Sequence, residues 1–282
     1  MEVNNEFTAG RLILKILRGV FIAFIVMISV LPFLWVFIAS FQANGDIISG
    51  AMRFSQGLKY ENYIKAFRIA PLAQFYGNSL IVAVGGTALN LAVMSMAAYV
   101  ISRFQFKMNT FLKLLFTSVL FIPCAALLHP LYITMNQLHL YDSVLGLILV
   151  YAGLGMATTF YIMMSYYLTV PKSLEEAAYL DGAGFFKAYV TIIVPLSKPC
   201  FATAAVLQFL LCWNEFQFAL TLTTGNRSRT LPIALYYFTS QFASDYGAMF
   251  AATVLIALPS IIIYCVLQKQ VISGLTSGAV KG

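Results

Sequence analysis

Three carboxylates lie within seven positions of one another in the stretch EEAAYLDGAG, residues 175–184, as Glu175, Glu176 and Asp181. They are three of only ten acidic residues in the whole chain. Carboxylates grouped on one short segment can bind a complementary, positively charged surface of another protein. The stretch is therefore either a merely solvated loop segment or a surface that can bind a soluble partner.

The residues around these carboxylates predict a short helix over about residues 173–184. Pro171 can begin a helix, and Ser173 followed by Glu176 matches the capping-box pattern, with Ser173 as the N-cap. Acidic side chains in the first turn favour the positive end of the helix dipole. Gly182 then allows a sharp exit from the helix.

The rest of the chain is strongly apolar. Hydrophobic residues make up 61% of the 282 residues, charged residues make up 10%, and the mean hydropathy is +0.85. Because a soluble domain carries about 25% charged residues, this composition places the chain in a lipid bilayer. The four cysteines lack the paired spacing of a disulfide framework or a metal site. They are Cys124, Cys200, Cys212 and Cys265.

Six apolar segments are long enough to cross a bilayer, which takes about 20 residues. They are residues 16–39, 77–102, 111–131, 142–168, 199–223 and 246–269. Their apolar runs are continuous rather than alternating, so we expect each of them to be a helix. No linker or repeat divides the chain. We therefore expect an all-α, polytopic membrane protein with a single transmembrane domain over residues 1–282.

Lysine and arginine set the expected orientation of these spans, because cytoplasmic loops carry an excess of both. With the N-terminus inside, 11 of the 17 basic residues are cytoplasmic, and so are both termini and residues 173–184. In the first outer loop, Tyr60, Tyr63, Ile64 and Phe67 follow helical spacing. They predict a short amphipathic helix, which either packs as part of the loop or docks an external protein.

A longer motif resembles a known family. Glu176-Ala177-Ala178, Gly182, Ile192 and Pro195 match the EAA loop of ABC-importer permeases, which reads E-A-A, three residues, G, nine residues, I-x-L-P. Val194 stands where leucine is usual. Further segments resemble the carbohydrate-uptake branch, to which maltose permease subunits belong, so that the likeness covers nearly the whole chain. These segments are ENYIKAF (61–67), GNSLIVA (77–83), WNEFQFALTL (213–222) and GLTSGAVKG (274–282).

This resemblance implies a type I ABC-importer permease fold with a cytoplasmic coupling helix that docks in a cleft of an ATPase subunit. The coupling residues that it implies are Glu175, Glu176, Ala177, Ala178, Asp181, Gly182, Ile192 and Pro195. The tail residues Gly278 and Lys281 are expected to reach the same ATPase. The implied partners are a second permease subunit, two copies of an ABC ATPase, an extracytoplasmic solute-binding protein, a carbohydrate and the bilayer of a bacterial cell. No nucleic-acid partner is expected.

We do not expect the chain to be an enzyme or to bind a cofactor or metal. It contains no G-x-x-x-x-G-K-[ST] run, so ATP and Mg are expected in the partner ATPase. An intramembrane enzyme is disfavoured because His129 and His139 have no nucleophile at a suitable spacing. A stand-alone ion-coupled carrier would want buried carboxylates near the midplane, where Glu215 is the one candidate. An ABC importer for a non-sugar solute also remains open.

Glu215 lies inside a predicted span, where a central carboxylate costs about 2.5–3.5 kcal/mol to insert. Gln208, Cys212 and Glu215 share one face of that helix. In one interpretation this face lines a solute path, with Gln208, Trp213, Asn214 and Glu215 as its site residues and aromatic rings stacking on the sugar. In the other, Glu215 makes an interhelical hydrogen bond near the outer end of the helix.

Overall fold

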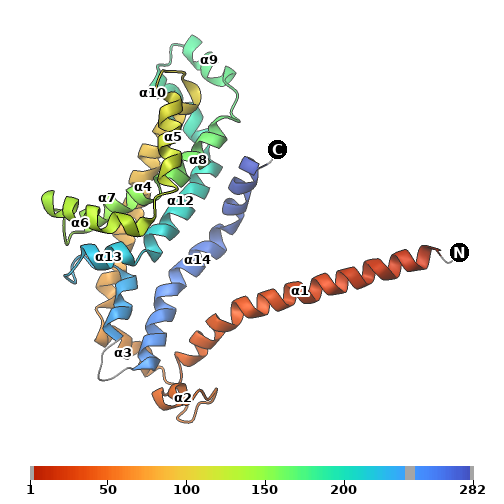
Figure 1. The fold of residues 1–282 in the computed structure, drawn as a ribbon, viewed down its shortest axis with the longest axis vertical. Helices are drawn as coiled ribbons and strands as arrows, with labels where there is room; N and C mark the ends of the chain where they lie inside the picture. The colour runs from red at the N-terminus through yellow and green to blue at the C-terminus, as the bar shows by residue number, and fades with distance from the viewer. Residues whose placement is uncertain (1–2, 239–244, 280–282) are drawn as a thin grey trace. The chain divides into compact units, whose positions relative to one another are not determined.

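The computed structural model describes residues 3–238 and 245–279, and within these residues the chain is helical and contains no strand. This confirms the predicted all-α fold. The chain is drawn as a ribbon in Figure 1. By its internal contacts it divides into two compact units. The first comprises residues 1–69 and 238–255, and the second comprises residues 70–237 and 256–282.

The first unit contains α1 (Val3–Ala39), α2 (Asn44–Ile48), α3 (Glu61–Ile69) and the beginning of α14 (Tyr246–Ala279). The amphipathic helix expected in the first loop is α3. Its buried side chains are Asn62 and Ala66, and the Asn62 amide donates to the carbonyls of Ser40 at 2.9 Å and Gln42 at 3.0 Å. Three of the four apolar residues at helical spacing face outward instead, whereas Tyr63 is half-buried and its hydroxyl lies 2.9 Å from Ser40 Oγ. Tyr60, Ile64 and Phe67 are exposed.

In the second unit, α4 (Leu72–Arg103) packs against α7 (Val144–Leu154), α8 (Met156–Tyr167) and α12 (Lys198–Asn214). Gly86 allows α4 to approach both α7 and α12 closely. A Cβ atom at Gly86 would lie 3.3 Å from Cys212 Sγ and 3.4 Å from Tyr151 Cβ. The helix has 32 residues and is therefore about 48 Å long at 1.5 Å per residue.

The six predicted spans correspond to three long helices and three bent pairs. The long helices Leu14–Ala39, Leu72–Arg103 and Tyr246–Gln268 can each cross a bilayer, and up to six spans result if each bent pair counts as one. The bends are 100° after α5 (Asn109–Val119), 50° between α7 and α8, and 78° before α12. Three of the predicted spans thus overlap long helices, and the other three overlap bent pairs of helices.

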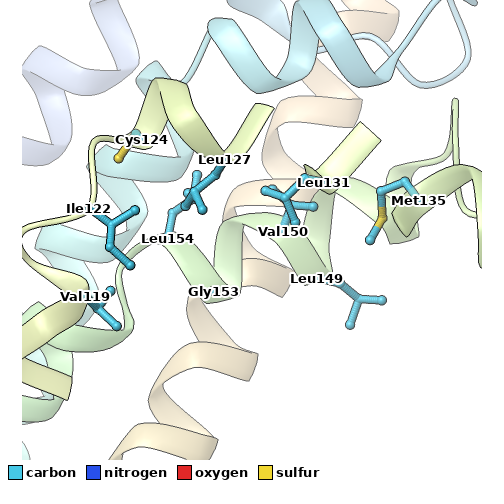
Figure 2. Close-up of a pocket in the computed structure, with 10 residues that line it drawn as sticks. All are labelled: Val119, Ile122, Cys124, Leu127, Leu131, Met135, Leu149, Val150, Gly153 and Leu154. Atoms are coloured by element: carbon cyan, nitrogen blue, oxygen red, sulfur yellow. The ribbon is translucent and has the colours of Figure 1, made fainter. Parts of the chain in front are cut away.

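The predicted span 111–131 is broken at Pro123. Pro123 disfavours a helical conformation at the preceding residue, and α5 ends at Val119. A short 3₁₀ turn, η1 (Cys124–Leu127), and α6 (Leu128–Gln137) follow. The bend leaves an apolar pocket of about 300 Å³ between this segment and α7 (Figure 2). Its lining residues are Val119, Ile122, Cys124, Leu127, Leu131, Met135, Leu149, Val150, Gly153 and Leu154.

The predicted span 199–223 is also interrupted. The helix α12 ends at Asn214, Glu215 is extended with ψ of 127°, and a separate helix, α13 (Gln217–Leu222), follows. The cause is the Glu215 carboxylate, which accepts hydrogen bonds from the backbone N–H groups of Phe218 at 2.8 Å and Ala219 at 3.0 Å. These bonds satisfy the free donors of a new helix, so the old one stops.

Candidate functional site

The predicted short polar helix is α9 (Ser173–Leu180). It differs from the prediction at both ends. Its N-cap is Lys172, with no side-chain capping bond, so the assignment of Ser173 as N-cap is wrong. It ends at Leu180 rather than near residue 184, because Gly182 has φ of +81° and reverses the chain.

The exit from α9 is a Schellman motif. The Gly182 N–H donates to the Tyr179 carbonyl at 3.0 Å, and the Ala183 N–H donates to the Ala178 carbonyl at 2.9 Å. A Cβ atom at Gly182 would meet no atom within 4 Å. Glycine is therefore needed here for its positive φ and not for close packing within this chain.

The three carboxylates predicted to form one patch separate into two environments. Glu176 and Asp181 are exposed, together with Ala177 and Gly182, whereas Glu175 is 4% exposed. The exposed surface of α9 thus carries two of the three acidic side chains. The third points into the second unit.

Glu175 forms a buried ion pair at the end of α4. Arg103 Nε lies 2.6 Å from Glu175 Oε1, and the two side chains are 4% and 6% exposed. The Tyr99 hydroxyl donates to Glu175 Oε2 at 2.7 Å. Arg103 also donates to the Val170 carbonyl at 2.9 Å, in the segment that leads into α9. Arg103 and Tyr99 were not predicted as site residues, although Arg103 is the last residue of a long apolar helix.

The ring of Tyr99 also holds the segment that follows α9. It stacks on Phe185 with ring centres 5.2 Å apart and lies 5.0 Å from the ring of Tyr189. The hydroxyl groups of Tyr189 and Ser95 are 2.7 Å apart. The segment comprises α10 (Phe185–Ala188), the π-turn η2 (Tyr189–Ile193) and α11 (Val194–Leu196). Figure 1 shows α9 and α10 together at the end of the unit where α4 ends.

Ile192 and Pro195 of the predicted motif lie in this segment. Ile192 is half-buried in the π-turn, and Pro195 is exposed in α11. Because proline has no N–H to donate to the preceding turn, it favours the irregular helix found here. Gly278 lies near the end of α14, and Lys281 lies outside the described residues.

The polar residues of α12 are used within the chain. Gln208 is buried and donates to the Tyr151 carbonyl at 2.9 Å, and a Cβ atom at Gly155 would lie only 1.6 Å from Gln208 Oε1. Trp213 is buried, stacks on Phe209 at 5.7 Å and donates to the Ile256 carbonyl at 3.4 Å. These contacts hold α12 against α7 and α14.

Glu215 makes the interhelical hydrogen bond that one of the two interpretations expected. The Tyr151 hydroxyl of α7 donates to Glu215 Oε2 at 2.6 Å. Asn214 is exposed, and its Oδ1 accepts a 3.0 Å hydrogen bond from the Ser260 hydroxyl. Phe216, also exposed, follows at the break between α12 and α13.

At its other end, α4 holds the loop of residues 224–231. The Asn78 amide donates to the Arg229 carbonyl at 2.8 Å and to the Asn226 carbonyl at 3.3 Å. The Leu231 N–H donates to Ser79 Oγ at 2.7 Å. These bonds join the first turns of α4 to the loop through neutral groups.

Asp142 binds the same loop from the segment before α7. Its carboxylate accepts from the N–H groups of Thr224 at 2.9 Å and Gly225 at 3.0 Å, and from the Ser228 hydroxyl. Burial alone would raise the pKa of the Asp142 carboxyl, but the hydrogen bonds from Ser228, Gly225 and Thr224 outweigh it and lower that pKa below its usual value.

The described residues contain no group of three or more histidine, cysteine, aspartate or glutamate side chains that could hold a metal ion. What they do contain is a set of bent, bilayer-length helices with a small polar helix held at one end. This arrangement is that of a polytopic membrane protein with a short polar helix at one end.

Comparison with known proteins gives the family. The family model described as "Binding-protein-dependent transport system inner membrane component" matches residues 91–275, and the chain belongs to this family. The diacetylchitobiose uptake system permease protein NgcG of Streptomyces coelicolor is 30% identical over 90% of this chain and 85% of its own. The trehalose/maltose transport system permease protein MalG of Thermococcus litoralis is 32% identical over 91% and 93%.

A solved structure supports the same fold. A chain of a bacterial ABC transporter involved in the import of the acidic polysaccharide alginate aligns with a TM-score of 0.80, covering 91% of this chain and 96% of that one. At 20% sequence identity, this likeness concerns the fold alone.

Proposed function

We propose that this chain is a permease subunit of an ATP-driven importer for a carbohydrate of the oligosaccharide class. It pairs with a second permease subunit and two copies of an ABC ATPase, which bind ATP and Mg, and an extracytoplasmic binding protein delivers the solute. Family membership supports the transport role. The similarity of the chain to the diacetylchitobiose permease NgcG and the trehalose/maltose permease MalG supports a carbohydrate as the solute.

The exposed surface of α9 is the observation that carries the proposed contact with the ATPase. Leu180 is 90% exposed beside the exposed carboxylates of Asp181 and Glu176. An apolar side chain flanked by charges is unfavourable in lipid and also when fully exposed to water. It is favourable in contact with the surface of a soluble protein. We therefore assign Glu176, Ala177, Asp181 and Gly182 to the contact. Glu175 is buried and acts on this contact from inside the chain.

The charge at the two ends of the second unit supports a cytoplasmic α9. Lysine and arginine residues gather in the segments near α9, at Arg103, Lys107, Lys172, Lys187 and Lys198. The loop of residues 224–231 carries Arg227 and Arg229. Because short cytoplasmic loops carry the excess of basic residues, α9 faces the cytoplasm, the loop faces outward and both termini lie inside.

For the solute path we propose the break between α12 and α13. Asn214 is exposed there, with its amide bonded to the Ser260 hydroxyl and the Leu210 carbonyl. Phe216 offers an exposed ring, which suits the apolar face of a sugar. Gln208, Trp213 and Glu215 shape this region through their bonds inside the chain. They act on the path by positioning rather than by direct contact.

Charge reversal at α9 tests the ATPase contact. We expect Glu176→Lys to abolish co-purification of the ABC ATPase co-expressed from the same host, since the exposed carboxylate meets a complementary surface. Glu61→Lys is the matched control, because Glu61 is also an exposed glutamate in the first turn of a short helix. Normal recovery of the ATPase with Glu176→Lys would refute the docking of α9.

Cysteine labelling tests the sidedness. In a chain with Cys124 and Cys265 changed to serine, Arg227→Cys should react with a membrane-impermeant maleimide added to whole cells, and Ser173→Cys should not. Both positions are exposed. The neighbouring Ser228 is unsuitable because it is buried against Asp142. Reversed labelling would overturn the orientation.

A further inference from the structure

The ion pair between Arg103 and Glu175 is too deeply buried to contact another subunit. Both side chains are more than nine-tenths buried within this chain. Glu175 is nevertheless the immediate neighbour of the exposed Glu176 on an eight-residue helix. One carboxylate of α9 therefore faces its partner while the next one faces α4.

The bonds of this carboxylate are made to a single helix. Glu175 Oε1 meets Arg103 and Oε2 accepts from Tyr99, and both partners lie in the last turns of α4. Arg103 in addition binds the Val170 carbonyl just before α9, and Tyr99 stacks on Phe185 just after it. The helix is thus held to α4 on its inner face and through the chain on both sides.

The other end of α4 holds a second segment of the chain. Asn78 and Ser79, the seventh and eighth residues of α4, hold the loop of residues 224–231 through three hydrogen bonds of 2.7–3.3 Å. Between Ser79 and Arg103 the helix runs without a break. A continuous helix of this kind spans about 36 Å at 1.5 Å per residue and is stiff along its axis.

We propose that Arg103, Glu175 and Tyr99 are positioning residues that lock α9 to α4, so that a displacement of α9 moves α4 as a rod and shifts the loop of residues 224–231. This rests on the proposed docking of α9 on the ATPase. A buried charge pair suits the role because neither partner can leave without stranding the other away from water. The residues at the surface bind the ATPase, and the buried ones carry its movement inward.

The test uses the assembled transporter in vesicles, with solute-loaded binding protein outside. The variants are Glu175→Gln and Tyr99→Phe, and the matched control is Glu176→Gln. We expect the first two to retain the ATPase but to transport roughly tenfold less solute per ATP hydrolysed. Glu175→Gln removes the charge that pairs with Arg103 and Tyr99→Phe removes the hydrogen bond to the carboxylate, and each such charge-assisted contact is equivalent to about that factor. The control should instead weaken ATPase binding.

A second variant guards against simple misfolding. Arg103→Met with Glu175→Met removes both charges together and leaves neither stranded. We expect this double variant to assemble and bind the ATPase normally while remaining uncoupled. A nitroxide label on Arg227→Cys, in a chain with Cys124→Ser and Cys265→Ser, reports the far loop. Its ATP-dependent spectral change should disappear in the double variant.

The outcomes separate the two proposals. Normal transport per ATP in Glu175→Gln and in the double variant would overturn the lock, as would loss of ATPase binding in both. Normal ATPase binding in Glu176→Gln, with coupling lost in Glu175→Gln, would count against docking through Glu176 and leave the lock standing. A label response at position 227 that persists in the double variant would refute transmission through α4.

Discussion

The two ends of α4 hold their neighbours by different chemistry. At the α9 end, a buried carboxylate pairs with Arg103 and Tyr99. At the other end, Asn78 and Ser79 bind the backbone of the loop of residues 224–231. A buried charge pair cannot be lost in part, because removing one partner leaves the other charge buried and unpaired. Bonds to backbone groups can be lost one at a time and depend little on the side chains of the loop.

This difference fits the roles proposed above for the two ends. The α9 end needs one fixed geometry if movement of the ATPase is to reach α4. At the loop end, Asn78 and Ser79 bind only carbonyl and N–H groups of the loop and none of its side chains. Asp142 adds a charge to the loop end, but it accepts from N–H groups of the loop backbone and from the Ser228 hydroxyl and has no charged partner there.

The largest expected effect is at the ion pair. Arg103→Met leaves the Glu175 carboxylate buried and unpaired, and should lower the free energy of unfolding of the complex by about 3–5 kcal/mol. The double change Arg103→Met with Glu175→Met should restore most of this loss. Denaturant unfolding in detergent measures both. If the double variant is as unstable as the single one, the all-or-nothing character assigned to this end is wrong.

The next effect concerns Asp142. Asp142→Ala leaves the N–H groups of Thr224 and Gly225 without their acceptor, at a cost of about 1–3 kcal/mol. Asp181→Ala is the control, because that carboxylate is exposed. Equal stability of the two variants would show that the loop does not depend on the Asp142 contact.

The lowered pKa of Asp142 also fixes a pH dependence. A carboxyl with a pKa lowered by folding contributes stability that is fully present above its unfolded value of about 3.9 and is lost as the pH falls through its lower folded value. The difference between the wild type and Asp142→Ala should therefore be constant between pH 5 and pH 8 and shrink below pH 3.9. Unfolding curves over this range measure it, and a difference that grows on acidification would contradict the assignment.

The general fold was predictable from the sequence because runs of apolar residues show where helices cross a bilayer. The breaks within those runs were less predictable from the sequence. The break at Pro123 carries a local signal, since a proline disfavours helix in the residue before it. The end of α12 at Asn214 does not, because it depends on where the Glu215 carboxylate finds donors, and a glutamate is common within helices.

The candidate site shows the same limit. The motif identified α9, and Gly182 has the positive φ that its exit requires. The sequence could not separate Glu175 from Glu176, which are adjacent and chemically identical. Their burial is decided by Tyr99 and Arg103, more than 70 positions earlier in the chain. Such a pairing follows from packing between distant segments, and no local spacing encodes it.

A smaller effect tests the surface of α9. Gly182→Ala forces an alanine into φ of +81° and should cost about 1–2 kcal/mol, which weakens ATPase binding by loosening the end of the helix. Gly184→Ala is the matched control, because Gly184 has an ordinary φ of −77° and both positions are open. Pull-down of the ATPase across a concentration series compares the two. Equal binding would mean that the exit geometry does not matter for docking.

The smallest effect is expected at Ser79. Ser79→Ala removes one hydrogen bond, to the Leu231 N–H, and should cost about 1 kcal/mol. Ser102→Ala is the control at the other end of α4, since the Ser102 hydroxyl donates only to the Tyr99 carbonyl of its own helix. The informative measurement is the combination of Ser79→Ala with Glu175→Gln. The two positions lie far apart, so their effects on stability should add. Their effects on transport per ATP should not add if α4 is a single rod. Once the connection is broken at one end of the helix, breaking it at the other end should cause no further loss of transport. Additive losses in transport would instead mean that the two ends of α4 act independently.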